Sequence, residues 1–295
     1  MTGSENNMQT YSINGSLCTP EEAMIPVTDH GFLYGDGVFE GLRFYGKRIL
    51  KFTAHLNRLV ESASAIALPL PLSLEELRES VLKVVEASPL ENGYVRLIIT
   101  RGTGPLGIDP RSCDTGNVII IAGELKMVSQ TVRHQGARLI IASTRRLAAD
   151  QLDSRIKSLN YLNQIMARIE ANEAGADEAV VLNQAGFVAE GTADNIFIVK
   201  GGILLTPPVT DCALDGITRN IILDIADKLS IPAEEKSITP FDVFTADECF
   251  LTGTGAELIP VREVVGRHIR QAPGPIFQRI EKQFQIELQH DTLFC

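Results

Sequence analysis

The chain has 295 residues, of which 44% are hydrophobic and 22% charged, and its formal net charge is −10. This length and composition allow a substantial buried core and are sufficient for two modest domains. The negative charge makes nucleic acid and anionic membranes poor partners. The strongest apolar run, residues 118–122, is much shorter than the roughly 20 residues that span a bilayer.

Cysteine usage bears on the cellular compartment and on metal binding. The cysteines are odd in number, widely separated and never in a C-x-x-C pair, and the histidines are equally scattered. This pattern argues against a disulfide framework or a zinc site and fits a reducing environment. Because the polar N-terminus also lacks a signal-peptide pattern, we expect a cytoplasmic protein without a metal. The cysteines are Cys18, Cys113, Cys212, Cys249 and Cys295.

The first half of the chain has the pattern of strands interspersed with helices. Asn14-Gly15, between short strand-like stretches, indicates a hairpin. Thr53 is the expected N-cap of one helix, and Ser73 with Glu76 forms the capping-box pattern of a second. Residues 102–116 form a Gly/Pro/Asp-rich loop, and loops of this length are often functional. Strands are predicted at residues 38–45, 48–52, 94–100 and 117–122.

Residues 123–136 are polar and irregular, so we place a domain boundary there. In the second half, helices are predicted at residues 159–174, ending at Gly175, and at 218–229 and 275–288. Strands are predicted at residues 137–142, 178–182, 195–200, 203–205 and 248–252. The fold class is therefore α+β, with an N-terminal α/β domain at residues 1–125, a linker at 126–136 and a larger C-terminal domain at 137–295.

Two isolated charged residues are candidates for chemistry. Lys157 directly precedes an apolar helix, where partial burial would lower the pKa of an amine and suit it to carbonyl chemistry. Glu190 lies in a turn of small residues between apolar strands, where it could face a protonated heterocyclic nitrogen. Taken alone, a lysine or a turn glutamate is more often a solvated charge.

Two glycine-containing segments could hold an anion. Gly216 opens a helix whose first N–H groups lack intrahelical acceptors. Residues 251–256 end a strand in small residues whose backbone N–H groups could form a nest. Arg58, on the first helix, could supply positive charge. Each signal is weak by itself, and neither segment matches a nucleotide-binding motif.

Together these segments resemble a known family. GFLYGDGVFEGLRFY, HLNRL, YVRL, RIKSLNYLN, AEGTADNIF, GITR and TGTGAEL follow the order found in class IV, fold type IV pyridoxal-phosphate transaminases. The resemblance is closest to branched-chain amino acid aminotransferases and extends from about residue 10 to residue 288. It implies the D-amino acid aminotransferase-like fold, with a pseudo-barrel C-terminal domain.

The resemblance also implies a role for each matching residue. Lys157 would bind pyridoxal 5′-phosphate covalently and shuttle the substrate proton, Glu190 would pair with the pyridine nitrogen, and Tyr161 would hydrogen-bond the phenolic oxygen. The phosphate cradle would consist of Arg58, Ile217, Thr218 and Thr254. The substrate would meet Tyr34, Phe39, Gly41, Tyr94, Arg96, Leu106 and Gly255.

Within these roles, Tyr94 and the backbone at Thr254 and Gly255 would bind the α-carboxylate, and Arg96 the second carboxylate of glutamate or 2-oxoglutarate. The loop containing Leu106 resembles a segment that reaches the neighbouring subunit's site, so a homodimer is the smallest expected assembly, and hexamers occur in the family. Two departures, Gly255 for a common alanine and Ala193 for a common glycine, concern substrate preference.

The resemblance leaves several functions open. We expect amino transfer from L-leucine, L-isoleucine or L-valine to 2-oxoglutarate, with amino acids and 2-oxo acids as the partners. D-amino acid aminotransferase, (R)-amine transaminase and aminodeoxychorismate lyase share the fold and the lysine. A non-catalytic relative or a cofactor-free Schiff-base aldolase would leave Glu190 or the anion cradles without a role. The sequence leaves the substrate ranking and the physiological direction open.

Overall fold

The computed structural model describes residues 8–125, 129–289 and 293–294. It divides into two compact units. The first unit comprises Met1–Leu125, Ile156–Asn160 and Thr292–Cys295, and the second comprises Lys126–Arg155 and Tyr161–Asp291.

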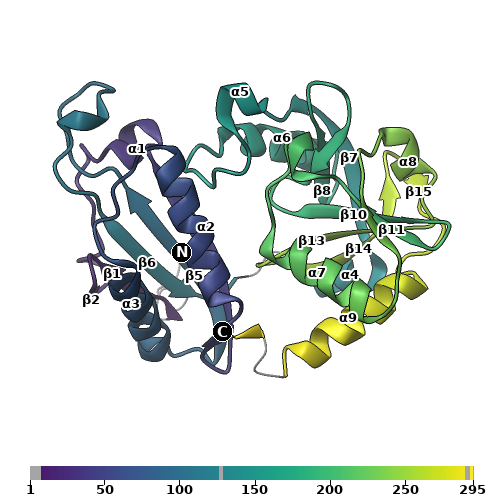
Figure 1. The fold of residues 1–295 in the computed structure, drawn as a ribbon, viewed down its shortest axis with the longest axis horizontal. Helices are drawn as coiled ribbons and strands as arrows, with labels where there is room; N and C mark the ends of the chain where they lie inside the picture. The colour runs from purple at the N-terminus through teal and green to yellow at the C-terminus, as the bar shows by residue number, and fades with distance from the viewer. Residues whose placement is uncertain (1–7, 126–128, 290–292, 295) are drawn as a thin grey trace. The chain divides into compact units, whose positions relative to one another are not determined.

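The first unit is an antiparallel sheet covered by two helices on one face. Its strands run in the order β2-β1-β6-β5-β3-β4, and Figure 1 shows α2 and α3 lying against it. The elements are β1 (Thr10–Ile13), β2 (Ser16–Cys18), α1 (His30–Tyr34), β3 (Gly37–Tyr45), β4 (Arg48–Ile49), α2 (Phe52–Ala65), α3 (Leu74–Ala87), β5 (Asn92–Thr100) and β6 (Val118–Gly123).

Strand alternation separates two faces of this sheet. Val38, Leu42 and Phe44 of β3 point into the core beneath α2 and α3. Because side chains alternate along a strand, Phe39 and Gly41 lie on the opposite face. The register of β3 with β5 is continuous from Gly37 to Tyr45, so this division holds along the whole strand.

The second unit is built on a mixed nine-stranded sheet. Its strands run in the order β12-β11-β10-β13-β14-β7-β8-β9, and β15 pairs with β14. The helix α6 connects the parallel strands β7 and β8, while α7 and α9 pack together near β13. The elements are α4 (Gln130–Gln135), β7 (Ala137–Arg145), α5 (Ala149–Leu152), α6 (Leu162–Glu173), β8 (Glu178–Leu182), β9 (Val188–Glu190), β10 (Asn195–Lys200), β11 (Ile203–Thr206), α7 (Ile217–Lys228), β12 (Ala233–Glu235), α8 (Pro240–Phe244), β13 (Glu248–Gly253), β14 (Glu257–Val264), β15 (Arg267–His268) and α9 (Pro275–Glu287).

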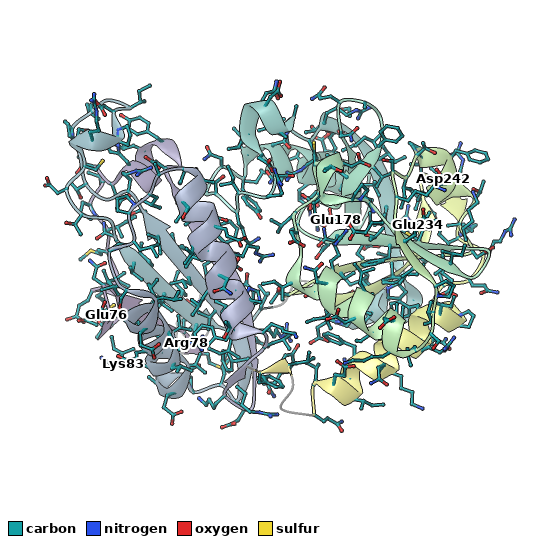
Figure 2. All side chains as sticks on the ribbon, in the orientation of Figure 1. Glu76, Arg78, Lys83, Glu178, Glu234 and Asp242 are labelled. Carbon is teal, nitrogen blue, oxygen red and sulfur yellow. The ribbon has the colours of Figure 1, made fainter. Side chains whose placement is uncertain are left out.

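Local sequence signals predicted several elements correctly. The capping box of Ser73 and Glu76 opens α3 as expected, and Glu76 is labelled in Figure 2. The strands β8 and β10 have the predicted bounds. The Asn14-Gly15 hairpin joins β1 to β2, with Asn14 at φ 50° and Gly15 at φ 82°. Positive φ at both positions is what a tight two-residue hairpin turn requires.

Other boundaries were predicted wrongly. The N-cap of α2 is Lys51 at φ 48°, with no side-chain cap hydrogen bond, and not Thr53. Phe52 belongs to that helix rather than to β4, because its ring is buried in the helix-covered core. The helix predicted from residue 159 begins at Leu162. Leu159 is instead held by β3, through a long-range backbone hydrogen bond with Gly37 that helical periodicity does not reveal.

The division into units differs from the expected contiguous domains. Ile156–Asn160, which contains Lys157, groups with the first unit rather than with residues 137–295. Of the expected linker at residues 126–136, residues 126–128 lie outside the described part of the chain. Gln130–Gln135 form the helix α4, which packs against β14.

Glu170 of α6 secures the end of β7 through hydrogen bonds. It accepts bonds from the Ser143 amide at 2.6 Å, the Thr144 amide at 3.0 Å and the Thr144 hydroxyl at 2.6 Å. Burial opposes ionisation of this carboxyl, but these hydrogen bonds outweigh it and lower the pKa to about 2. The stabilisation is therefore complete above pH ~4.5 and is lost as the pH falls toward 2.

We predict that Glu170→Gln lowers the free energy of unfolding at pH 7 by about 1 kcal/mol, a modest value because water screens this partly exposed group. The difference from wild type should shrink as the pH falls from 5 to roughly 2. Urea unfolding at each pH measures it. Glu173→Gln, at an exposed position of the same helix, is the control. An equal pH dependence in both variants would contradict the assignment.

Candidate functional site

Lys157 is held at the edge of β3 by its own backbone. The Phe39 amide donates to the Lys157 carbonyl at 2.9 Å, and the Leu159 amide donates to the Gly37 carbonyl at 2.9 Å. The Lys157 amide donates to the Ser62 hydroxyl of α2 at 3.1 Å. Backbone hydrogen bonds on both sides of the residue fix the point from which its side chain extends.

The Lys157 side chain reaches the face of the sheet opposite the helices. Its Nζ lies 4.6 Å from the centroid of the Phe39 ring. The Arg96 guanidinium carbon lies 4.4 Å from the same centroid and 5.7 Å from that of Tyr94. One aromatic ring thus contacts two cations, an arrangement favoured by the negative face of the ring. Two positive groups gathered there can attract an anionic ligand.

The close approach of Tyr94 to β3 requires glycine at position 41. A Cβ at Gly41 would lie 1.9 Å from the Tyr94 hydroxyl oxygen. Arg96 is paired directly with Gly41 across the two strands. The structure therefore brings Phe39, Gly41, Tyr94 and Arg96 together with Lys157, and their role in binding a substrate stays a prediction of the resemblance.

Arg58 projects from α2 toward Glu40 of β3. Its Nε and Nη2 donate to the Glu40 carboxylate at 2.7 and 2.9 Å. His55, one turn earlier on α2, contacts the same carboxylate through Nδ1 at 2.8 Å. Glu40 and His55 were not identified from the sequence. The available signal was a glutamate at an inward position of an apolar strand.

Tyr34 and the long loop meet within the first unit. The Gly107 amide donates to the Tyr34 hydroxyl at 3.0 Å. The neighbouring side chains Leu106 and Ile108 are 82% and 84% exposed. The loop thus presents two large apolar side chains to the exterior of the unit.

In the second unit, Glu190 is a buried carboxylate at the end of β9. Its Oε1 lies 2.8 Å from Nη2 of Arg146, and both side chains are almost fully buried. Its Oε2 accepts the Leu214 amide at 2.9 Å. Glu190 is therefore an oriented, ion-paired group and not the solvated turn residue that its sequence context alone suggested. Arg146 was missed because it follows Arg145 in a polar stretch.

The helix α7 begins at a glycine that lies close to β10. Its N-cap is Gly216, which has no side chain with which to cap the first turn, and that turn contains Ile217 and Thr218. A Cβ at Gly216 would lie 1.8 Å from the Asn195 Oδ1. The Asn195 amide group donates to the Leu214 carbonyl at 2.9 Å. The helix start is therefore held against β10, and its first-turn N–H groups lack intrahelical acceptors, as at any helix N-terminus.

The remaining predicted residues of the second unit lie on other elements. Tyr161 is the N-cap of α6 and is half-buried. Thr254 and Gly255 form the turn between β13 and β14, which the Gly253–Glu257 pair closes. Within this unit, the Leu214 amide links Glu190 directly to the segment that leads into α7.

We predict that Arg146→Met lowers the free energy of unfolding by about 3–5 kcal/mol, because it leaves the buried Glu190 carboxylate without its counter-charge. Chemical denaturation measures the loss. Arg155→Met is the matched control, because Arg155 pairs with Asp153 at the surface, where water screens the pair, and its loss should cost much less stability. Adding Glu190→Gln to Arg146→Met should recover part of the loss. Equal effects of the two single variants would contradict the role of Arg146.

Comparisons with known proteins agree with this arrangement. A Methanocaldococcus jannaschii protein, provisionally assigned as a branched-chain-amino-acid aminotransferase, is 43% identical over 279 residues, covering 94% of this chain and 96% of its own. The crystal structure of the Escherichia coli branched-chain amino acid aminotransferase superposes with a TM-score of 0.91 at 33% identity, covering 94% of this chain and 93% of that chain.

A second solved structure carries the cofactor in its name. The branched-chain amino acid aminotransferase from Thermobaculum terrenum, described as the PLP-form (holo-form), superposes with a TM-score of 0.86 at 28% identity, covering 97% of this chain and 95% of that chain. The model of the amino-transferase class IV family matches residues 37–264. The expected family and fold are thereby confirmed, and the chain belongs to the class IV aminotransferases, with the fold of branched-chain amino acid aminotransferases.

Proposed function

We propose that this protein transfers the amino group of L-leucine, L-isoleucine or L-valine to 2-oxoglutarate, reversibly, with pyridoxal 5′-phosphate as cofactor. The observation that carries the proposal is the cluster of Lys157, Phe39, Tyr94 and Arg96 on one face of the first unit. A primary amine next to an apolar ring, a tyrosine hydroxyl and an arginine suits a substrate with an apolar side chain and a carboxylate.

The residues of the chain fit this cofactor. Lys157 supplies the amine, and Arg58 supplies a guanidinium fixed by Glu40. The first turn of α7, at Ile217 and Thr218, offers backbone donors suited to a phosphate. Thr254 adds a small polar residue in the β13–β14 turn, where a backbone nest can form.

Glu190 and Tyr161 complete the proposed set of cofactor contacts. Glu190 is an acceptor already oriented by Arg146 and by the Leu214 amide, as contact with a protonated ring nitrogen requires. We assign Tyr161 to the phenolic oxygen. The assignment of each residue rests on its contacts within its own unit.

When bound, pyridoxal phosphate supplies an aldehyde for the substrate's amino group and a ring that draws electrons from the α-carbon. Lys157 Nζ takes up the proton of that α-carbon and later returns it. The hydroxyl of Tyr94, lying against Gly41, orients the α-carboxylate together with the backbone of Gly255. Phe39 and Tyr34 provide apolar contact, and Arg96 binds the second carboxylate when the substrate is glutamate or 2-oxoglutarate.

The proposed assembly is at least a homodimer. The exposed Leu106 and Ile108 support it, because apolar side chains on an ordered loop gain most from burial against another chain. We propose that Leu106 completes the substrate pocket of the partner subunit.

We also propose a cytoplasmic location. Cys18, Cys113, Cys212 and Cys249 are free thiols, while Cys295 lies outside the described residues. In the described part of the chain, no helix has the length and apolar character to cross a membrane.

We predict that borohydride reduction of the purified protein attaches a pyridoxyl group to Lys157, identified by peptide mapping. Lys157→Ala should lose the visible absorption band of the bound cofactor and all measurable transamination, because no other amine replaces it. Lys47→Ala is the control, since the Lys47 amine donates to the Val85 carbonyl at 3.1 Å, away from this face. A pyridoxyl adduct on another lysine would refute the proposal.

A donor panel tests the substrate class. L-leucine, D-alanine and (R)-1-phenylethylamine are each supplied with 2-oxoglutarate, and product formation is measured. We predict turnover with L-leucine, because both Tyr94 and Arg96 suit an L-amino acid and a dicarboxylate. Activity confined to D-alanine or to the amine would move the protein to one of the alternative functions.

The same assay separates the role of Arg96. Arg96→Met should raise the KM for 2-oxoglutarate roughly 10- to 100-fold, the cost of losing one charged hydrogen-bonding partner. The KM for 2-oxoisocaproate, which has one carboxylate, should change much less. An equal rise for both oxo acids would contradict the assignment of Arg96 to the second carboxylate.

A further inference from the structure

Glu40 is a charged residue placed among apolar ones. Its side chain is 0% exposed, and its neighbours on the same face of β3 are Val38 and Leu42. Burying a carboxylate in such surroundings is costly unless hydrogen bonds and a counter-charge compensate. A structural role in the sheet would be served equally well by an apolar residue, so Glu40 requires a separate explanation.

Groups from one helix satisfy this carboxylate. Arg58 engages it through Nε and Nη2, and His55 donates through Nδ1 at 2.8 Å. A carboxylate that binds two nitrogens of one guanidinium fixes its plane as well as its position. Burial raises the pKa of Glu40, but Arg58 and His55 outweigh it and hold that pKa well below its usual range.

His55 contributes direction rather than charge. Burial lowers its pKa in spite of the adjacent Glu40, so the imidazole is neutral near pH 7. Because a carboxylate oxygen only accepts, the proton of the neutral ring lies on Nδ1. The cluster of Arg58, Glu40 and His55 therefore carries no net charge, and what it provides is an oriented guanidinium.

Stability alone does not account for the cluster. Replacing a buried ion pair by well-packed apolar side chains is often neutral or stabilising. The location is informative instead: Ser62, one turn beyond Arg58 on α2, accepts the Lys157 amide at 3.1 Å. Phe39, next to Glu40 on β3, donates to the Lys157 carbonyl. The strand and helix that carry the cluster also hold the backbone of Lys157.

This inference rests on the proposed function. We propose that Glu40 is a positioning residue of the cofactor site: it holds the guanidinium of Arg58 in the direction that binds the phosphate of pyridoxal phosphate, and His55 holds Glu40. The effect of Glu40 is therefore specific to the phosphate and passes entirely through Arg58.

The test compares two ligands on the full-length apoprotein. Pyridoxal phosphate and pyridoxal, which lacks the phosphate, are titrated into wild type, Glu40→Gln, Arg58→Gln and the double variant. Glu40→Gln should weaken binding of pyridoxal phosphate roughly 10-fold or more and leave pyridoxal binding within about 3-fold. The double variant should bind pyridoxal phosphate no more weakly than Arg58→Gln, because coupled residues are not additive.

Three outcomes would overturn the inference: unchanged pyridoxal phosphate binding in Glu40→Gln, equal loss for both ligands, or multiplicative losses in the double variant. If wild type binds neither ligand covalently, the proposed function itself fails. That result is seen in wild type, whereas the three outcomes above are seen only in the variants, so the two failures are distinguishable.

A second pair of variants keeps the test decisive if Glu40→Gln fails to fold. His55→Asn retains a donor near the Nδ1 position and should keep pyridoxal phosphate affinity within about 3-fold, because a replaced hydrogen bond preserves the contact. His55→Leu removes the donor and should reproduce the phosphate-specific loss. Equal affinities of these two variants for pyridoxal phosphate would overturn the role of His55 and of the cluster.

Discussion

The backbone pairing of residues 157–159 with the edge of β3 is the constraint on which the first unit's chemistry depends. The strand β4 pairs with β3 only at Phe44 and Tyr45, so the edge near Val38 accepts another segment, and Ser158 forms a bridge there. Lysine has a long, flexible side chain, and only a fixed backbone gives its amine a defined range. The same strand supplies Phe39, whose ring lies next to that amine. The same backbone hydrogen bonds therefore fix the positions of both the amine and the ring.

An acidic protein is proposed here to bind anionic ligands. Two of the arginines in or near the proposed site are each paired with a glutamate at hydrogen-bond distance. Two buried arginines, Arg58 and Arg146, each face a buried glutamate. Neither adds net charge to its surroundings. In the proposed site, recognition of a phosphate or a ring nitrogen would rely on the direction of donors and acceptors, aided by backbone N–H groups at the start of α7, rather than on a general excess of positive charge. Oriented donors and acceptors of this kind allow a protein with a net charge of −10 to bind a phosphate.

Much of the fold could be predicted from sequence, and the failures have physical causes. The capping box of α3 and the strands β8 and β10 carry their signals within a few residues. The start of α6 depends on a pairing with a strand more than a hundred residues earlier, which no local pattern encodes. The strand β14 was missed because its charged residues and proline interrupt an apolar pattern. The candidate site residues were identified from motifs that occur in a fixed order. Glu40 and Arg146 are not among those candidates, and only their contacts in the structure reveal them.

The alternation along β3 has a consequence for how this protein can change. In the proposed site, the inward residue Glu40 orients Arg58 and the outward residues Phe39 and Gly41 form the pocket floor, because neighbouring residues of a strand face opposite ways. A single inserted or deleted residue within β3 would turn the inward side chains outward and the outward side chains inward over the rest of the strand. Substitution of Phe39 or of Leu42 alters one face of the strand without the other. The number of residues in β3, in contrast, cannot change without altering both faces. Engineering of altered selectivity should therefore leave the spacing of β3 intact and exchange only its outward side chains.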